Sequence, residues 1–370
     1  MFAYWKNCFH PFFLYYGMGA IWLCTCAMHI PDGYLSPITS FIMFIIVFPF
    51  WLRGVQKLRE KVNSKQIPLI ALFATFSFVI MMFNVPLPGG TTGHAVGGAL
   101  AAIILGPEIA TIAVSIALVI QAFFFGDGGI LNIGANCFNM AVVLPYFSFA
   151  VYQWISKKSL PTSMRRVIGA ALGGWIGLSV AAFVAAVEFG IQPIFWQAAD
   201  GTPLYAPYPL SIAIPAMVIP HLFAASVVEG LVTALVVYYL QRAKQPALEI
   251  VNGTQISTEL NGFAHWRVMW VSLAVLVVAT PIGLLAPGTA WGEWGTKELS
   301  GLGLSFIPQG MQHLSGFWSA PLADYDLPLL GNANLAYILS ALVGILVTIV
   351  VVWLFSTLVL SGKSKKNQAL

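Results

Sequence analysis

The stretch CTCAMHIPDGYLSP, residues 24–37, marks the point where an apolar N-terminal segment ends and a short polar loop begins. Residues 1–27 carry a lysine near the start, an apolar region, and the small residues Thr25 and Ala27 at a possible cleavage site, which is the pattern of a signal peptide. We predict that residues 1–27 are cleaved; an uncleaved helix and translation from Met28 are the alternatives. Cleavage or a start at Met28 would both give a chain that begins with Met28 and His29.

The composition predicts a membrane protein, because only 8% of the 370 residues are charged and 59% are hydrophobic, whereas soluble domains average about 25% charged residues. A bilayer core takes roughly 20 apolar residues per helix. We therefore predict an all-α polytopic bundle of about seven spans, followed by two further C-terminal spans, and a kink at Pro215 and Pro220. The candidate spans are 35–52, 67–86, 93–106, 109–125, 135–156, 167–190, 209–240, 268–286 and 333–361.

Fifteen of the seventeen lysines and arginines fall on one side of the membrane if these nine spans alternate in direction. They form four clusters, at residues 53–65, 157–166, 242–267 and 363–366. The positive-inside rule makes this side cytoplasmic, so we predict a mature N-terminus outside and a cytoplasmic C-terminus. Because the cations are confined to these short clusters, the net charge of +4 does not indicate a nucleic-acid partner.

A chain that begins at Met28 would have a metal chelate at its end. The Met28 amine, the His29 backbone nitrogen and the His29 Nδ1 can hold one divalent ion in fused five- and six-membered rings. The three nitrogens lie in a plane, which favours a square-planar Ni(II) or Cu(II) site, with Co(II) as a further candidate. His94, at the outer end of a predicted span, is the candidate fourth ligand; the alternative is a structural hydrogen bond at the membrane interface.

The loop MHIPDGYLSP resembles the N-terminal signature of the CbiM/NikM family, the substrate-binding membrane subunits of energy-coupling-factor cobalt and nickel transporters. Three later stretches are similar to the same family: GHAVGGALAAIILGP, QAFFFGDGGILNIGANCFNM and PHLFAASVVEGLVTALVV. The resemblance covers about residues 28–240. It implies a helical bundle in a bacterial or archaeal cell membrane, an N-terminal loop inserted into its centre, and metal ligands at Met28, His29 and His94.

Other polar residues are candidates for supporting roles. Residues in or just after the outer loop could brace the N-terminal loop or orient the histidines, or could simply form turns and helix caps: Asp127, Asn132, Asn136 and Asn139. His221 and Glu229 lie eight residues apart in the long predicted span. Ionisable groups at membrane depth are functional candidates, although this pair could equally be an internal contact that fixes the kink.

The C-terminal part has a different layout. Residues 241–264 form a polar, predicted cytoplasmic linker, and residues 265–370 hold two spans around an outer segment at 287–332. This arrangement resembles the small two-span CbiN/NikN-like subunit that is fused to some members of the family. The PDGLE motif typical of such segments is absent, and PGTAWGEW stands in its place.

These features predict a non-enzymatic transport subunit that captures Co²⁺ or Ni²⁺ outside the cell, with no organic cofactor; the sequence does not choose between the two metals. The chain has no G-x-x-x-x-G-K-[ST] loop, so it requires a cytoplasmic ATPase and a coupling transmembrane subunit as partners. One alternative is an ion-coupled secondary transporter that uses the intramembrane carboxylates of Glu188 and Glu229. A second is an intramembrane enzyme such as a metalloprotease, but the H-E-x-x-H motif is missing.

Overall fold

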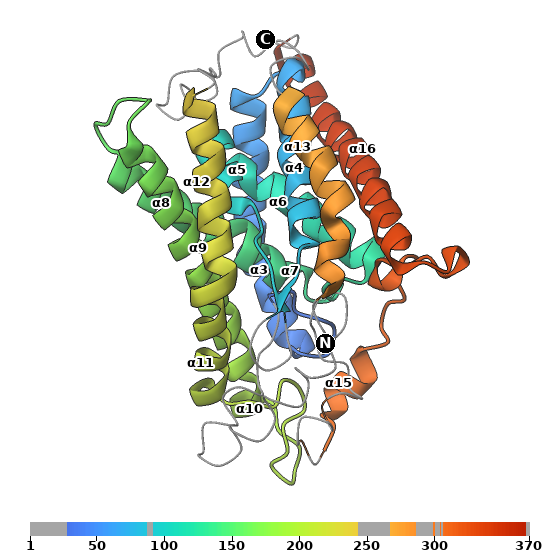
Figure 1. Cartoon of the computed structure of the whole chain (residues 1–370). Coiled ribbons are helices and arrows are strands. Elements are labelled where there is room, and N and C mark those ends of the chain that lie inside the picture. Colours follow the sequence, from blue (N-terminus) through green and yellow to red (C-terminus); the bar gives the residue numbers. More distant parts are fainter. Residues whose placement is uncertain are drawn as a thin grey trace, which may run out of the picture.

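The computed structural model describes residues 28–86, 92–242, 267–285, 299, 304 and 306–367. Long helices run side by side in a bundle (Figure 1). In the part of the chain that is described, seven helices are long and apolar enough to cross a membrane: Pro37–Lys61, Ser64–Met81, Pro107–Phe125, Ile133–Ser156, Met164–Phe195, Leu210–Arg242 and Ala333–Ser361. The protein is therefore a multi-pass helical membrane protein. The predicted signal peptide and most of the predicted linker lie outside the described residues.

Local sequence signals start and stop the helices. Ser36 caps the first long helix, because its Oγ accepts a hydrogen bond from the Thr39 backbone nitrogen at 3.1 Å, and Pro37 occupies the first turn. The elements up to residue 242 are α3 (Pro37–Lys61), α4 (Ile67–Met81), β1 (Val85–Pro86), β2 (Thr92–Gly93), α5 (Gly98–Leu105), α6 (Pro107–Ile120), α7 (Ile133–Asn136), α8 (Leu144–Ser156), α9 (Met164–Gly190), α10 (Gln192–Phe195), α11 (Leu210–Pro220) and α12 (Ser226–Arg242).

The predicted span at 93–106 is the main departure from expectation. The chain pairs β1 with β2, continues as irregular backbone to residue 97, and then forms the eight-residue helix α5. Gly97 has a left-handed backbone (φ 74°) that no helix can continue through. Every residue of α5 is buried. Non-helical backbone at membrane depth is tolerated only when protein covers it, and here the surrounding helices provide that cover.

The kink predicted near Pro215 and Pro220 appears as a π-helical segment, His221–Ala225, between α11 and α12. Pro220 cannot donate a backbone hydrogen bond, so the helix widens at this point. Two more π-helical segments, Gln121–Phe125 and Cys137–Val143, lie at the end of α6 and before α8. The segment Gln121–Phe125 ends two residues before Asp127, and the segment Cys137–Val143 begins directly after Asn136.

The C-terminal part packs against α4. Its elements are α13 (Arg267–Ala279), a 3₁₀ segment (Thr280–Leu285), α15 (Gln309–Leu314), two 3₁₀ turns (Ala323–Tyr325 and Pro328–Leu330) and α16 (Ala333–Asn367). The apolar helix Trp270–Leu285 is shorter than the span predicted at 268–286.

In Figure 1 the α8–α9 turn, the end of α12, the start of α13 and the end of α16 all lie at the upper end. The described residues of the cationic clusters at 157–166, 242–267 and 363–366 therefore lie at one end of the bundle.

Candidate metal site

The N-terminal loop, residues 28–36, lies inside the bundle. Met28, His29 and Ile30 are at most 1% exposed. The backbone of Ile30 is fully paired: its nitrogen donates to the Asn136 Oδ1 at 2.8 Å, and its oxygen accepts from the Asn136 Nδ2 at 3.2 Å and from the Gly129 nitrogen at 2.8 Å. An inserted loop must satisfy its backbone groups in this way.

Asp32 fixes the second half of the loop. Its carboxylate accepts from the Ile130 nitrogen at 3.1 Å and the Leu131 nitrogen at 2.8 Å. Burial raises the pKa of this carboxyl, although the backbone hydrogen bonds oppose the shift. The two segments approach so closely that a side chain at Gly129 would overlap the Asp32 backbone nitrogen. Asp32 therefore shapes the turn and does not face the histidines.

Two imidazoles from distant parts of the chain converge at the end of this loop. The His29 Nδ1 and the His94 Nε2 are 3.2 Å apart, and the ring centroids are separated by 4.9 Å. Each residue is only 1% exposed. The His94 Nδ1 lies 3.1 Å from the Ala95 oxygen. This contact assigns the proton to Nδ1 and leaves the Nε2 lone pair directed at His29.

Asp127 contacts the same ring nitrogen of His29 as His94 does. Its Oδ1 is 3.0 Å from the His29 Nδ1. Its Oδ2 accepts from the Gln121 Nε2 at 3.2 Å and from the Tyr325 hydroxyl at 2.7 Å. Burial raises the pKa of the Asp127 carboxyl, but the adjacent His29 ring and the hydrogen bonds from His29 and Tyr325 outweigh it, and the pKa lies below its ordinary value. The site thus contains a buried carboxylate beside the imidazole.

The four supporting candidates do not share one role. Asn136 pairs with Ile30, and the Asn132 Nδ2 donates to the Pro31 oxygen at 2.6 Å, so both asparagines hold the N-terminal loop. Asp127 contacts His29. Asn139 differs from the other three, because its Nδ2 donates to the Glu188 Oε2 on α9 at 2.9 Å. Asn139 lies about one helical turn after Asn136, and its side chain therefore meets a different neighbour.

His221 and Glu229 do not form the predicted pair. Among the described residues no ion pair joins them, and the His221 Nδ1 instead lies 2.7 Å from the Met217 oxygen. The Glu229 carboxylate reaches across to the start of α5. It accepts from the backbone nitrogens of Val96 at 2.8 Å, Gly97 at 2.8 Å and Ala99 at 3.0 Å. Glu229 therefore caps α5 from another helix and fixes the backbone that carries His94.

Sequence reasoning missed Gln121 and Tyr325. The sequence could have indicated Gln121, because this glutamine lies within a run of apolar residues in a predicted span. A polar side chain in such a place needs a hydrogen-bond partner. The sequence could not have indicated Tyr325, because this residue lies between two aspartates, 198 residues from Asp127. Only the tertiary fold brings these groups together.

Side chains alone do not complete a metal site here. The described residues contain no group of three or more His, Cys, Asp and Glu side chains arranged to hold a metal ion. A metal ion held by the His29 and His94 side chains would therefore need further ligands.

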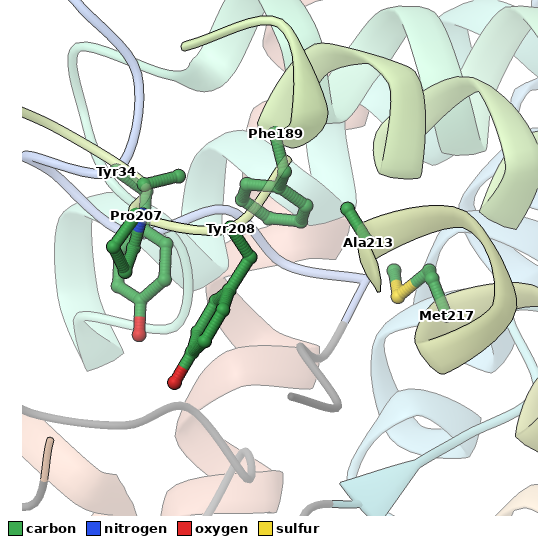
Figure 2. Close-up of a pocket in the computed structure, with 7 residues that line it drawn as sticks. Tyr34, Phe189, Pro207, Tyr208, Ala213 and Met217 are labelled. Atoms are coloured by element: carbon green, nitrogen blue, oxygen red, sulfur yellow. The ribbon is translucent and has the colours of Figure 1, made fainter. Parts of the chain in front are cut away.

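A small apolar pocket lies beside the N-terminal loop but offers no alternative site. Figure 2 shows Tyr34 of the loop facing Phe189 of α9, with Ala213 and Met217 of α11 nearby. Pro207 and Tyr208 complete the part of the lining labelled there. No His, Cys, Asp or Glu lines this pocket. The residues around this pocket pack the N-terminal loop against α9 and α11.

Comparison with known proteins identifies the family. Residues 29–247 match the family model described as CbiM, cobalt uptake substrate-specific transmembrane region. This chain belongs to the CbiM family. Residues 265–361 of this CbiM-family protein match the model of the PDGLE domain, although the PDGLE letters themselves are absent.

Relatives extend over both parts of the CbiM-family chain. The "Fused nickel transport protein NikMN" of Rhodobacter capsulatus is 49% identical over 86% of this chain and 94% of its own. The "Probable fused nickel transport protein LarMN" of Lactiplantibacillus plantarum is 41% identical over 88% of this chain and 96% of its own. A crystal structure described as a truncated transition metal transporter has 46% identity and a TM-score of 0.55, and covers 58% of this chain and 99% of that one. All three are named as transporters rather than enzymes.

Proposed function

We propose that this CbiM-family protein captures Ni²⁺ or Co²⁺ outside the cell and delivers the ion for ATP-driven import. The observation that supports the proposal best is the convergence of the His29 Nδ1 and the His94 Nε2, 3.2 Å apart in a buried loop. Two nitrogen ligands at neighbouring positions around one metal ion are separated by a similar distance. The Met28 amine and the His29 backbone nitrogen would complete a planar set of four nitrogens.

Charge balance also supports this site. A divalent cation in a buried environment requires compensating negative charge. The His29 backbone nitrogen contributes one negative charge when it loses its proton, and the Asp127 carboxylate beside His29 contributes the second. Four nitrogen ligands in a plane suit Ni²⁺, and two relatives at 41–49% identity are named as nickel transport proteins. We therefore propose Ni²⁺ as the preferred substrate.

In this proposal the end that bears the cationic clusters faces the cytoplasm, and the N-terminal loop opens to the outside. Residues 28–240 form the metal-binding unit, and residues 265–370 form the CbiN/NikN-like unit. An ATPase and a coupling membrane subunit act as partners. The alternative of a secondary transporter is disfavoured by Glu229, because three backbone hydrogen bonds occupy its carboxylate.

Radiolabelled Ni²⁺ uptake tests this function. Cells that express the chain together with the ATPase and coupling subunits are expected to accumulate Ni²⁺, and a partner ATPase with its nucleotide-binding lysine replaced should abolish most of the uptake. An uncoupler of the proton gradient, applied while ATP is maintained, should leave uptake largely unchanged. Full-rate uptake by the chain without any partner, lost upon uncoupling, would instead establish the secondary-transporter alternative.

The proposed chelate requires a free amine on Met28, so we expect the mature chain to begin there. Terminal sequencing or intact mass measurement of the Ni²⁺-loaded protein from membranes should find Met28 first. A variant in which Thr25 and Ala27 are replaced by bulky residues should keep its leader and lose tight Ni²⁺ binding. A protein that retains residues 1–27 and binds Ni²⁺ as tightly would refute both the cleavage and the amine ligand.

A further inference from the structure

The outer segment of the C-terminal part lies directly against the metal site. The Trp318 Nε1 donates to the Phe123 oxygen at 2.9 Å, and the Leu322 nitrogen donates to the Phe124 oxygen at 2.9 Å. Both acceptors belong to the π-helical segment that leads to Asp127. Earlier along the same outer segment, α15 lies at the lower end of the bundle (Figure 1), and Met311 packs against Gly33 of the N-terminal loop.

Tyr325 carries this contact into the site. Its hydroxyl donates to the Asp127 Oδ2 at 2.7 Å, and the Gln121 Nε2 lies within hydrogen-bond distance of both groups, at 3.1 Å from the hydroxyl and 3.2 Å from the carboxylate. The other oxygen, Asp127 Oδ1, takes no hydrogen bond apart from its contact with the His29 ring. Two donors therefore hold Oδ2, and this leaves Oδ1 directed at His29.

The position of Tyr325 is fixed from several sides. The residue is 1% exposed, and its ring stacks on Phe125 with centroids 4.6 Å apart and an interplanar angle of 19°. Its carbonyl accepts from the Ser340 hydroxyl of α16 at 2.8 Å. Asp324 and Tyr325 both adopt left-handed backbones, with φ of 59° and 54°. Such a conformation in two successive non-glycine residues persists only where the surrounding structure imposes it, typically at functional sites.

We propose that Tyr325 is a positioning residue of the metal site, through which the C-terminal part orients the Asp127 carboxylate toward His29. The inference rests on the proposed function and adds a residue to it. Without the hydroxyl, one donor to Oδ2 is lost, and the carboxylate is free to turn away from His29. The negative charge that compensates the buried ion is then no longer held in place.

The chain offers a matched control in Tyr337. This tyrosine belongs to the same C-terminal part, is 1% exposed, and donates its hydroxyl to the Met82 oxygen at 3.0 Å. Its ring packs against that of Tyr325, but its hydroxyl bonds to the end of α4. Tyr325→Phe and Tyr337→Phe each remove one buried hydroxyl. The first removes the hydrogen bonds to Asp127 and Gln121, and the second removes the hydrogen bond to the Met82 oxygen.

The experiment is a Ni²⁺ titration of the purified full-length protein against a competing chelator, with an absorption spectrum of the bound ion. Partners that orient metal ligands are typically worth 10–100-fold in affinity. We expect Tyr325→Phe to weaken Ni²⁺ binding about 10-fold and to shift the spectrum, while Tyr337→Phe stays within about twofold of wild type. Both variants should lose some thermal stability, but only Tyr325→Phe should change the spectrum of the bound ion. Equal Ni²⁺ affinities in the two variants would overturn the inference.

A double-mutant cycle with Asp127→Asn separates positioning from general damage. If Tyr325 acts through the carboxylate, Tyr325→Phe should have little further effect on affinity in the Asp127→Asn background. A second 10-fold loss in that background would overturn the inference while leaving the proposed function intact. A wild-type protein that does not bind Ni²⁺ would overturn both.

Discussion

Replacing His29 with alanine is expected to abolish tight Ni²⁺ binding, with a larger loss than the replacement of any other single side chain. In the proposed site His29 contributes its backbone nitrogen and its Nδ1, and the imidazole closes the six-membered ring of the chelate. Alanine leaves two adjacent nitrogens and their five-membered ring, but it removes the six-membered ring and the third nitrogen. His94→Ala should retain the three N-terminal ligands but lose the nitrogen, 3.2 Å from His29, that connects the loop to the bundle. We expect that loss to be at least 10–100-fold.

The measurement is Ni²⁺ titration of the purified mature protein, with a visible spectrum to report the geometry. His221→Ala is the matched control, because it removes another fully buried imidazole whose Nδ1 contacts the Met217 oxygen instead of the site. It should keep Ni²⁺ affinity near that of wild type. Unchanged affinity in His94→Ala, or the spectrum of an octahedral oxygen-rich centre, would show that the site has been assigned wrongly.

The second large effect is expected for Glu229→Gln, although Glu229 contacts neither histidine in the hydrogen bonds described. Its carboxylate accepts three backbone hydrogen bonds, from Val96, Gly97 and Ala99. An amide has only one acceptor oxygen, so at least one buried backbone nitrogen would lose its partner and face an NH₂ group. Each lost hydrogen bond to a charged group costs about 1.5–3 kcal/mol. The backbone that carries His94 should loosen, and Ni²⁺ affinity and thermal stability should fall together.

Glu188→Gln provides the comparison. Glu188 is also buried in the bundle, but its carboxylate accepts a hydrogen bond from one side chain, that of Asn139, which can rotate its amide to suit the new partner. Thermal unfolding and Ni²⁺ titration of both variants should show the larger loss in Glu229→Gln. If the two variants behave alike, the capping of α5 by Glu229 does not control the position of His94.

Hydropathy and charge predicted most of the helical architecture, because lipid selects long apolar helices whatever their neighbours are. The same reasoning misjudged residues 93–106. This stretch is apolar enough for a span, yet Gly97 and the Glu229 carboxylate, more than 130 residues further along, allow irregular backbone inside the bundle. Asn139 and Tyr325 show the same limit, since their partners were set by tertiary packing. Local sequence carried no information about those partners.

In the proposed site, the burial of both histidines would control how fast an ion enters and leaves. His29 and His94 are each 1% exposed, and Asp32, Asn132 and Asn136 fix the N-terminal loop by hydrogen bonds. A competing molecule would therefore not reach an ion bound in the proposed site directly. Exchange must wait for the loop to withdraw. The dissociation rate is then set by an internal opening step and not by the concentration or strength of a scavenger outside. The residence time of the ion would then not follow from its affinity alone. A partner subunit that pulls the loop outward would shorten the residence time without offering the ion a stronger ligand.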